Sequence, residues 1–443
     1  MSRRSPLLGL ITVGALTASV IAGSSAVARL AHGPTGHADA EAVAGATGGR
    51  WVASWTSMPQ LTEPHNLPPA PFTQENLVLR DSTLRQTIRV SVGGQRMRIR
   101  LSNAFGGAPL PITAASVALP AGGQAGASAI EPGTGRRVAF SGRSSVVIPG
   151  GAQMVSDPID LPLAARSNLA VTLYLAEGQR SNNITSHPGS RTTSHLVAGN
   201  HIEDTALSGA TPTDHWYFLS GVEVAAPPAT ATATAVMLGD SLTDGRGSTT
   251  NGNNRWPDQL LDRLHTYRPT ANVALVNQAA GGNRVLNDGL GPNALARLDR
   301  DVLAQSGVRW LVVFEGVNDI GTAEATEAAQ KAVADDLLTA YDQIVTRAHA
   351  QGIRVYGATL TPFGGNSGYD DAAGTREVAR QTVNHWIRTS GRFDAVIDFD
   401  RAARDPANPR QLLSTVDTGD HLHLNAAGYK LLADTVPAGL FHH

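Results

Sequence analysis

The chain contains no cysteine, which excludes disulfides, zinc–thiolate sites and thiol chemistry. It also has no excess of basic charge, because 35 Lys and Arg stand against 37 Asp and Glu, for a net charge of −2. Proteins that bind nucleic acid or anionic membranes usually have a strong basic excess, so we expect neither partner. The apolar run Leu7 to Ile21 is too short for a comfortable membrane span, and no internal repeat is visible. The length of 443 residues and the 42% hydrophobic content predict two domains with cores of their own.

The N-terminus has the pattern of a secretion signal. Arg3-Arg4 precedes the apolar run, and the small residues Ala26-Val27-Ala28 fit a cleavage site, with Ala38-Asp39-Ala40 as a second candidate. We therefore predict a signal peptide over 1–28, a disordered leader over 29–49, a secreted protein, and no stable membrane anchoring after cleavage. An uncleaved anchor is the alternative, and the arginine pair leaves the twin-arginine export route open.

Residues 50–226 have a β-type pattern. Apolar and polar residues alternate over 84–92 and again over 96–101, on either side of Gly93-Gly94, which predicts a β-hairpin. Further short strands are expected near 52–55, 112–119, 145–148 and 169–175. A β-sandwich or jelly roll is the expected fold of this accessory domain.

The arginines of the two alternating runs are expected to share one face of that hairpin. They are Arg85, Arg89, Arg96, Arg98 and Arg100. One interpretation is a contact to an anion or an acidic sugar. The favoured interpretation is a solvated outer face, because exposed strand faces are normally polar.

A Pro- and Ala/Thr-rich stretch predicts a linker over 227–234, after which strands and helices alternate from 235 to 443. Strands are expected at 235–238, 272–277, 308–314, 353–359 and 394–398. Helices are expected at 324–351 and 375–389, and a last one from 425. This alternation predicts a mostly parallel sheet with helices on both faces, and a site at the carboxyl ends of its strands.

Ser241 follows the first of these strands within the segment Gly239-Asp240-Ser241-Leu242. The nucleophile-elbow pattern G-x-S-x-G does not fit, because Thr243 stands where its second glycine should be. Taken alone, a serine after a strand is more often a cap or turn residue than a nucleophile.

Two further segments follow strands and could surround a reacting group. Gly281-Gly282 follows the strand 272–277, and paired glycines let the backbone approach a ligand and expose an N–H. Asn318 follows the strand 308–314, where its amide could donate to a developing oxyanion. By itself the first segment would be an ordinary turn and the second a helix cap.

The fourth segment places Asp420 three residues before His423, near the C-terminus. In a turn this spacing brings a carboxylate to the imidazole, where it can orient the ring. Serine, aspartate and histidine in this chain order are the groups of a hydrolase triad. His421 is an alternative base, and a metal site on Asp420, His421 and His423 is the rival interpretation.

Together the four segments resemble the blocks of the SGNH hydrolases, also called the GDSL esterase/lipase family. The blocks are Gly239 to Leu242, Gly282 with Asn283-Arg284, Gly316-Val317-Asn318-Asp319, and Asp420 to His423, so that the resemblance covers about 236–436. Leu424 and Gly281 differ from the residues frequent in the family, and neither is a proposed catalytic group. More weakly, the segments 51–56 and 102–107 resemble a β-rich module that precedes the hydrolase in some secreted members.

The resemblance implies a flavodoxin-like three-layer α/β/α domain and a serine mechanism. Ser241 would be the nucleophile, His423 the base and Asp420 the group that orients its ring. The oxyanion hole would consist of the backbone N–H groups of Ser241 and Gly282 and the side-chain amide of Asn318. Asp240 would be structural, and neither a metal nor a cofactor is expected.

The predicted function is that of a secreted carboxylesterase for short acyl esters, including acetyl esters on carbohydrate. A lipase for longer chains is the alternative, although the loops after the motifs offer few large apolar residues beyond Trp256 and Phe363. A carbohydrate-binding protein with an inactive hydrolase half is the alternative from another class. The β-rich domain could bind glycan, shape the rim of the site or stabilise the enzyme.

Overall fold

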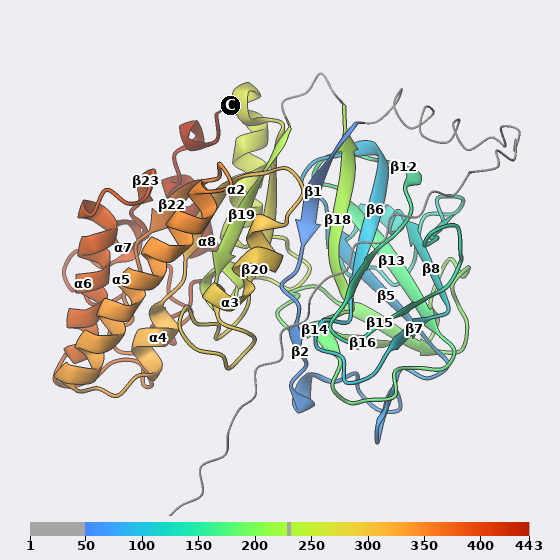
Figure 1. The fold of residues 1–443 in the computed structure, drawn as a ribbon, viewed down its shortest axis with the longest axis horizontal. Coiled ribbons are helices and arrows are strands. Elements are labelled where there is room, and N and C mark those ends of the chain that lie inside the picture. The colour runs from blue at the N-terminus through green and yellow to red at the C-terminus, as the bar shows by residue number, and fades with distance from the viewer. Residues whose placement is uncertain (1–48, 228–231, 443) are drawn as a thin grey trace, which may run out of the picture. The chain divides into compact units, whose positions relative to one another are not determined.

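The computed structural model describes residues 49–227 and 232–442 (Figure 1). Its N-terminal half is a β-sandwich of two antiparallel sheets, as predicted. The five-stranded sheet runs in the order β1 (Arg50–Thr56), β18 (Leu219–Ala226), β6 (Gly94–Ser102) and β11 (Gln153–Val155), with β12 (Ile159–Leu163) also paired to β6. The six-stranded sheet runs in the order β16 (Thr211–Thr213), β15 (Ser194–Ala198), β5 (Ser82–Arg89), β13 (Asn168–Leu175), β8 (Ala114–Ala118) and β9 (Arg136–Arg137).

Short strands and turns close the ends of the sandwich. The strands are β7 (Leu110–Ile112) with β10 (Val146–Ile148), β3 (Thr73–Gln74) with β4 (Leu77–Val78), and β2 (Gln60–Leu61), β14 (Thr185–His187) and β17 (Trp216–Tyr217). Two 3₁₀ turns, η1 (Pro64–Asn66) and η2 (Ala121–Gly123), are the helical elements of the described part of this half.

The hairpin predicted around Gly93-Gly94 is wrong. β5 pairs with β13 and β15, whereas β6 pairs with β18, β11 and β12, so the two strands lie in different sheets. Between them the chain crosses the sandwich: Ser91 donates its backbone N–H to the carbonyl of Ser54 in β1. Gly93 is needed for close packing, since a Cβ there would lie 2.2 Å from the carbonyl oxygen of Leu163. The alternating pattern correctly indicates which side chains face the core, because Leu84 and Ile99 are both fully buried in one core. It does not specify the partner strand.

The predicted solvated face of arginines is wrong for most of its members, since of the five only Arg96 is exposed. Arg85 is fully buried in β5, where it donates to Thr172 Oγ1 at 3.0 Å and to backbone carbonyls of neighbouring loops. Burial lowers the pKa of Arg85 to about 10, although nearby Asp204 raises it. Arg98 and Arg100, in the other sheet, both form ion pairs with the buried carboxylate of Glu223.

The C-terminal half contains a five-stranded parallel sheet, which confirms the predicted fold class. Its order is β20 (Val273–Ala279), β19 (Ala233–Gly239), β21 (Val308–Phe314), β22 (Arg354–Ala358) and β23 (Ala395–Ile397). Numbered along the chain this is 2-1-3-4-5, the flavodoxin-like order. The strand order reverses at β19, because β20 lies on one side of it and β21 on the other. The carboxyl end of β19 is therefore the expected ligand-binding edge.

The helices of this half form two separate groups (Figure 1). In one group α5 (Glu327–His349) packs on α3 (Ala294–Leu298), α4 (Val317–Thr322) and α6 (Thr375–Thr389). In the other group α8 (Ala426–Thr435) packs on α2 (Trp256–Thr266) and α7 (Phe399–Ala403). Single turns complete the half: α1 (Ser241–Asp244), the 3₁₀ turns η3 (Arg268–Thr270) and η5 (Ala438–Phe441), and the π turn η4 (Asp299–Leu303).

The linker predicted over 227–234 stays a prediction. In the structure β18 ends at Ala226 and β19 begins at Ala233. Linker residues 228–231 lie outside the described part of the chain, as do the predicted signal peptide and all of the predicted leader except Gly49. In the described ranges, no helix has the length and apolarity needed to span a bilayer.

The two halves have separate hydrophobic cores but are packed against each other. The described residues fall in one compact unit, so the domain limits 50–226 and 235–443 stay a prediction. Strand β1 lies beside the edge strand β20, and Thr56 Oγ1 donates to the carbonyl of Asn277 at 3.0 Å. Ala53 in β1 likewise donates its N–H to the carbonyl of Ser306 at 2.8 Å.

Candidate active site

Ser241 lies directly after the carboxyl end of β19, as the first residue of α1. Asp240 caps that helix, accepting a hydrogen bond from the backbone N–H of Leu242 at 2.9 Å. Burial, together with the neighbouring carboxylates, raises the pKa of Asp240 well above its usual range. At Gly239 a Cβ would lie 2.5 Å from Thr243 Oγ1 and 2.7 Å from the carbonyl oxygen of Phe314, so the turn has no space for a side chain.

His423 contacts both Ser241 and Asp420. Its Nε2 lies 2.9 Å from Ser241 Oγ, and its Nδ1 lies 2.6 Å from Asp420 Oδ2. The other carboxylate oxygen of Asp420 accepts the backbone N–H groups of Leu422 and His423, at 3.0 and 2.8 Å. The carboxylate is thereby fixed in its own turn and the imidazole is fixed by the carboxylate. The predicted spacing of three residues brings the two groups together.

The surroundings shift the pKa values of Asp420 and His423. Burial alone would raise the pKa of Asp420, but the hydrogen bonds from His423 and from backbone N–H groups hold it well below its ordinary value. Burial lowers the pKa of His423, which Asp420 opposes and the charges of Arg246 and Arg191 reinforce. At neutral pH the site therefore holds a carboxylate and a neutral imidazole, whose Nε2 can accept the serine proton.

His421, the alternative base, faces another group. Its Nδ1 lies 2.7 Å from Asp417 Oδ2, and the residue has a left-handed backbone with φ of 60°. The turn thus directs the rings of His421 and His423 to different carboxylates. Within the described ranges no three His, Asp or Glu side chains are grouped so that they could hold a metal ion.

The predicted oxyanion donors meet at the same place. The loop of Gly281 and Gly282 passes beside Ser241, since a Cβ on Gly281 would lie 4.0 Å from the Cβ of Ser241. Gly282 has a φ of 73°, a backbone that favours glycine. The N–H groups of Ser241 and Gly282 have no acceptor among the described residues. Both residues line one pocket together with Asn318 and His423.

Two hydrogen bonds orient the amide of Asn318. Its Nδ2 donates to the carbonyl of Asn283 at 2.8 Å, and its Oδ1 accepts from Tyr369 Oη at 2.7 Å. One N–H of the amide is therefore engaged, and the second is available to a ligand. Tyr369 comes from the loop after β22 and packs on Gly321, where a Cβ would lie 2.3 Å from the ring. Sequence reasoning missed Tyr369, because it belongs to none of the four motif segments.

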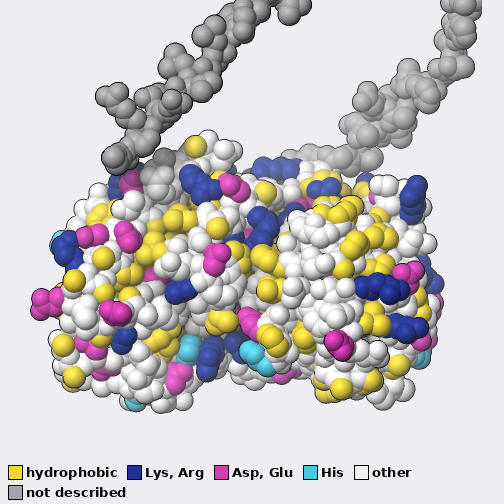
Figure 2. All heavy atoms as spheres, turned by 60° about the horizontal axis from the view of Figure 1, so that its bottom comes forward, with side chains coloured by type: hydrophobic (Ala, Val, Ile, Leu, Met, Phe, Trp, Pro, Cys, Tyr) yellow, Lys and Arg dark blue, Asp and Glu magenta, His cyan; other side chains and the backbone are white. Residues whose placement is uncertain are grey.

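The pocket has a volume of about 730 Å³, and both halves of the chain line it. The hydrolase half contributes the residues described above, together with Asp244, Arg246, Leu290, Asn366 and Leu422. The β-sandwich contributes Gln60, Glu63, His65, Asn66, Pro188, Gly189, Arg191 and His215. Figure 2 shows the molecule with the bottom of Figure 1 turned forward, and histidine and Lys or Arg side chains gather there in the hollow between the halves. Residues of the β-sandwich thus form part of the rim of this pocket.

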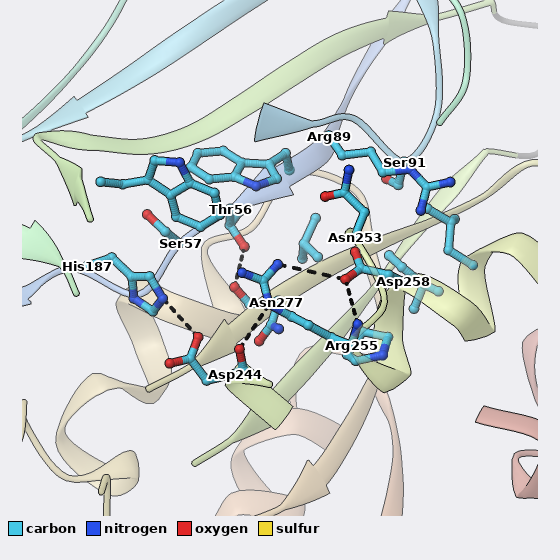
Figure 3. Close-up of a pocket in the computed structure, with 16 residues that line it drawn as sticks. Thr56, Ser57, Arg89, Ser91, His187, Asp244, Asn253, Arg255, Asp258 and Asn277 are labelled. Carbon is cyan, nitrogen blue, oxygen red and sulfur yellow. Dashed lines mark hydrogen bonds and ion pairs between the residues drawn. The ribbon is translucent and has the colours of Figure 1, made fainter. Parts of the chain in front are cut away.

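The β-sandwich also contacts the turn that carries Ser241 (Figure 3). His187 Nε2 lies 2.9 Å from Oδ1 of Asp244, the last residue of α1, and both side chains are buried. Burial tends to raise the pKa of Asp244, but His187 and nearby arginines hold it below its ordinary value. Arg255 donates from Nε to the carbonyl of Asp244 at 2.9 Å and also bonds the carbonyl of Ser190. The loop after β14 and the helix α1 are therefore held as one unit.

Comparison with known families identifies this half of the chain. The model of the GDSL-like Lipase/Acylhydrolase family matches residues 237–431. The C-terminal half is a GDSL-like hydrolase domain. The protein is accordingly a serine ester hydrolase. Residues before 237 lie outside the match, so the likeness of the β-rich half to accessory modules of this family stays a prediction.

Several solved structures are similar to this domain. A G-D-S-L family protein from Desulfitobacterium hafniense DCB-2 is 20% identical, with 46% of this chain and 97% of that chain covered and a TM-score of 0.35. The acetyl xylan esterase AlAXEase is 21% identical, covering 46% and 96% with a TM-score of 0.35. Axe2, an acetylxylan esterase from Geobacillus stearothermophilus, is 19% identical, covering 46% and 91% with a TM-score of 0.35. No curated protein matches the chain.

Proposed function

We propose that this GDSL-like hydrolase is a secreted carboxylesterase that cleaves short acyl esters, including acetyl esters on carbohydrate. One observation carries the catalytic part of the proposal. Ser241 Oγ lies 2.9 Å from His423 Nε2, and His423 Nδ1 lies 2.6 Å from Asp420 Oδ2. This is the arrangement that turns a weak hydroxyl into a nucleophile.

In the proposed reaction Ser241 attacks the ester carbonyl while His423 Nε2 takes the hydroxyl proton. The negative charge of the tetrahedral intermediate falls on the former carbonyl oxygen, beside the N–H groups of Ser241 and Gly282 and the amide of Asn318. His423 then gives its proton to the departing alcohol, which leaves an acyl-enzyme on Ser241. Water, deprotonated by the same imidazole, releases the acid and restores the serine.

The composition of the pocket favours a short acyl group over a long one. Apart from Tyr369, the larger apolar groups that line it are Leu290, Leu422 and Pro188, while most of the remaining lining is polar or charged. Trp256 and Phe363, the large apolar residues near the motifs, are buried in the hydrophobic core. A long acyl chain needs an extended apolar groove, and a pocket lined by many polar side chains suits a hydroxylated alcohol such as a sugar.

The test is hydrolysis of nitrophenyl esters from acetyl to palmitoyl by the mature protein and by Ser241→Ala. We expect kcat/KM to be highest for the shortest esters and the variant to be inactive. Acetylated polysaccharides are the next substrates to measure. A maximum at long chains would favour the lipase alternative, and activity that survives in Ser241→Ala would reject the mechanism.

Export is proposed on the N-terminal sequence pattern alone. Expression of the full chain in a bacterial host, followed by N-terminal sequencing of protein from the medium, tests it. A mature terminus after Ala28 is expected, and retention of the whole chain in the membrane fraction would contradict secretion.

A further inference from the structure

Two arginines line the same pocket as His423. Arg191 comes from the loop between β14 and β15 of the sandwich, and Arg246 follows α1 directly. Both are close enough to His423 for their charges to lower its pKa. The two cations thus come from different halves of the chain and line one pocket together with the imidazole.

Neither arginine forms an ion pair with a carboxylate among the described residues, although the charge of Arg191 acts on Asp244 and lowers its pKa. The acidic groups of the pocket, by contrast, have hydrogen-bond partners. Asp420 is bonded to His423 and Asp244 to His187. Glu63 accepts the side-chain amides of Gln60 and Asn66, at 2.8 and 3.0 Å.

The Nε atom of Arg191 is buried, and it has no hydrogen-bond partner in the part of the chain that the structure describes. A buried donor without an acceptor costs free energy, which a ligand with anionic oxygens would recover.

The backbone holds Arg191 in place at some conformational cost. Its φ is 50°, in the left-handed region that non-glycine residues rarely adopt. The backbone N–H of Asn251 donates to its carbonyl at 2.9 Å, and Arg255 bonds the carbonyl of the preceding Ser190. Such conformations persist where the surroundings over-determine them, and they cluster at functional sites.

We propose that Arg191 and Arg246 bind an anionic oxygen group, a carboxylate or a sulfate, on the alcohol part of the ester. The proposal rests on the function proposed above. It assigns the charge to the alcohol because His423, which lines the same pocket as the arginines, is the group that protonates the leaving alcohol. An O-acylated acidic sugar has this chemistry, whereas a neutral alcohol leaves both guanidinium groups without a partner.

The test compares acetyl esters that differ only in the charge of the leaving group. The substrates are 4-acetoxybenzoate, its neutral analogue 4-acetoxybenzamide, and 4-acetoxybenzenesulfonate. The readout is the ratio of kcat/KM for each anion to that for the amide, because a ratio cancels general losses of activity. We expect the wild-type ratio for at least one anion to be about ten or more. The anion with the larger ratio identifies the carboxylate or the sulfate as the preferred group.

Three variants locate the effect. Arg191→Gln is expected to lower the ratio about tenfold, and Arg246→Gln to lower it less, because that residue is exposed. Arg268→Gln, an exposed arginine outside the pocket, is the matched control and should keep the wild-type ratio. If Arg191→Gln does not fold, Arg191→Lys replaces it. This variant keeps the positive charge at position 191, so its ratio at ordinary salt should stay above the ratio of Arg246→Gln measured in high salt, which screens the remaining charge.

The outcomes separate the two proposals. The anion site is overturned if the wild-type ratios are near one, or if neither arginine variant lowers them. In that case the esterase proposal still holds, provided that cleavage of the ester in 4-acetoxybenzamide depends on Ser241. Equal rates for the wild-type protein and Ser241→Ala on all three esters reject the esterase, and the anion site with it.

Discussion

His187 Nε2 of the β-sandwich lies 2.9 Å from Asp244 Oδ1, at the end of the single helical turn that begins at Ser241. The pair is almost completely buried, and His187 is also stacked near Trp216 with ring centroids 5.8 Å apart. A carboxylate in such a place needs a partner, because water cannot solvate it. The hydrolase half therefore depends on the sandwich for the position of the turn that carries Ser241, the proposed nucleophile.

His187→Ala should destabilise the whole protein. Removing one partner of a buried pair leaves the other without its hydrogen bond and costs about 3 kcal/mol or more. The pKa of Asp244 is depressed in the folded state, so the pair stabilises the protein above the ordinary pKa of about 4 and loses this effect as pH falls. The free energy of unfolding, from denaturant titration at pH 7 and pH 4, measures this. The control is His201→Ala, from an exposed pair with Asp204, which should change stability far less. Equal effects of both variants would count against the coupling of the halves.

Asn318→Ala should lower kcat about a hundredfold or more, the loss expected for one oxyanion donor. Tyr369→Phe removes the hydroxyl that fixes the amide of Asn318 and should lower kcat by a smaller factor, about two- to tenfold. KM should change little in either variant, because the amide acts mainly on the transition state. A Tyr369→Phe enzyme with raised KM and normal kcat would make Tyr369 a substrate contact instead.

Asp420→Asn should lower kcat by about 10³-fold or more. The amide cannot favour the imidazole tautomer that leaves Nε2 free to accept the serine proton. Because Asp420 also accepts two backbone N–H bonds in its turn, the melting temperature must be measured beside the rate. A folded variant with near-normal turnover would remove Asp420 from the catalytic group.

The pH dependence of kcat/KM should have its acid limb below pH 6.5, the ordinary value for histidine. Burial lowers the pKa of His423, so the base stays unprotonated in mildly acidic solution. Arg246 contributes to the lowering, hence Arg246→Gln should move the limb to higher pH. A limb that stays in place in the variant would show that the Arg246 charge does not act on the catalytic base.

The hydrolase half could be predicted closely from the sequence because its signals are local. Each buried parallel strand is a continuous apolar run, α6 occupies the predicted residues 375–389, and the motif residues follow strand ends that meet at one edge. The structure brings together Ser241, Asp420, His423, Gly282 and Asn318, as their motif order suggested.

The β-sandwich could not be predicted to the same depth because its pairing is long-range. β6 pairs with β18, more than a hundred residues away, and an alternating pattern does not identify its partner. For the same reason no local pattern marks Arg191 or His187 as neighbours of Ser241. Their roles depend on how the sandwich packs on the hydrolase half.

The central claim is that His423 activates Ser241 as the nucleophile, and covalent labelling tests it most directly. The protein would be treated with a small alkyl fluorophosphonate, and the modified peptide located by mass spectrometry. The account predicts one adduct per chain, on Ser241, that forms rapidly in the wild-type protein and very slowly in His423→Ala. An adduct on another residue, or equally fast labelling of Ser241 in the folded His423→Ala variant, would contradict it.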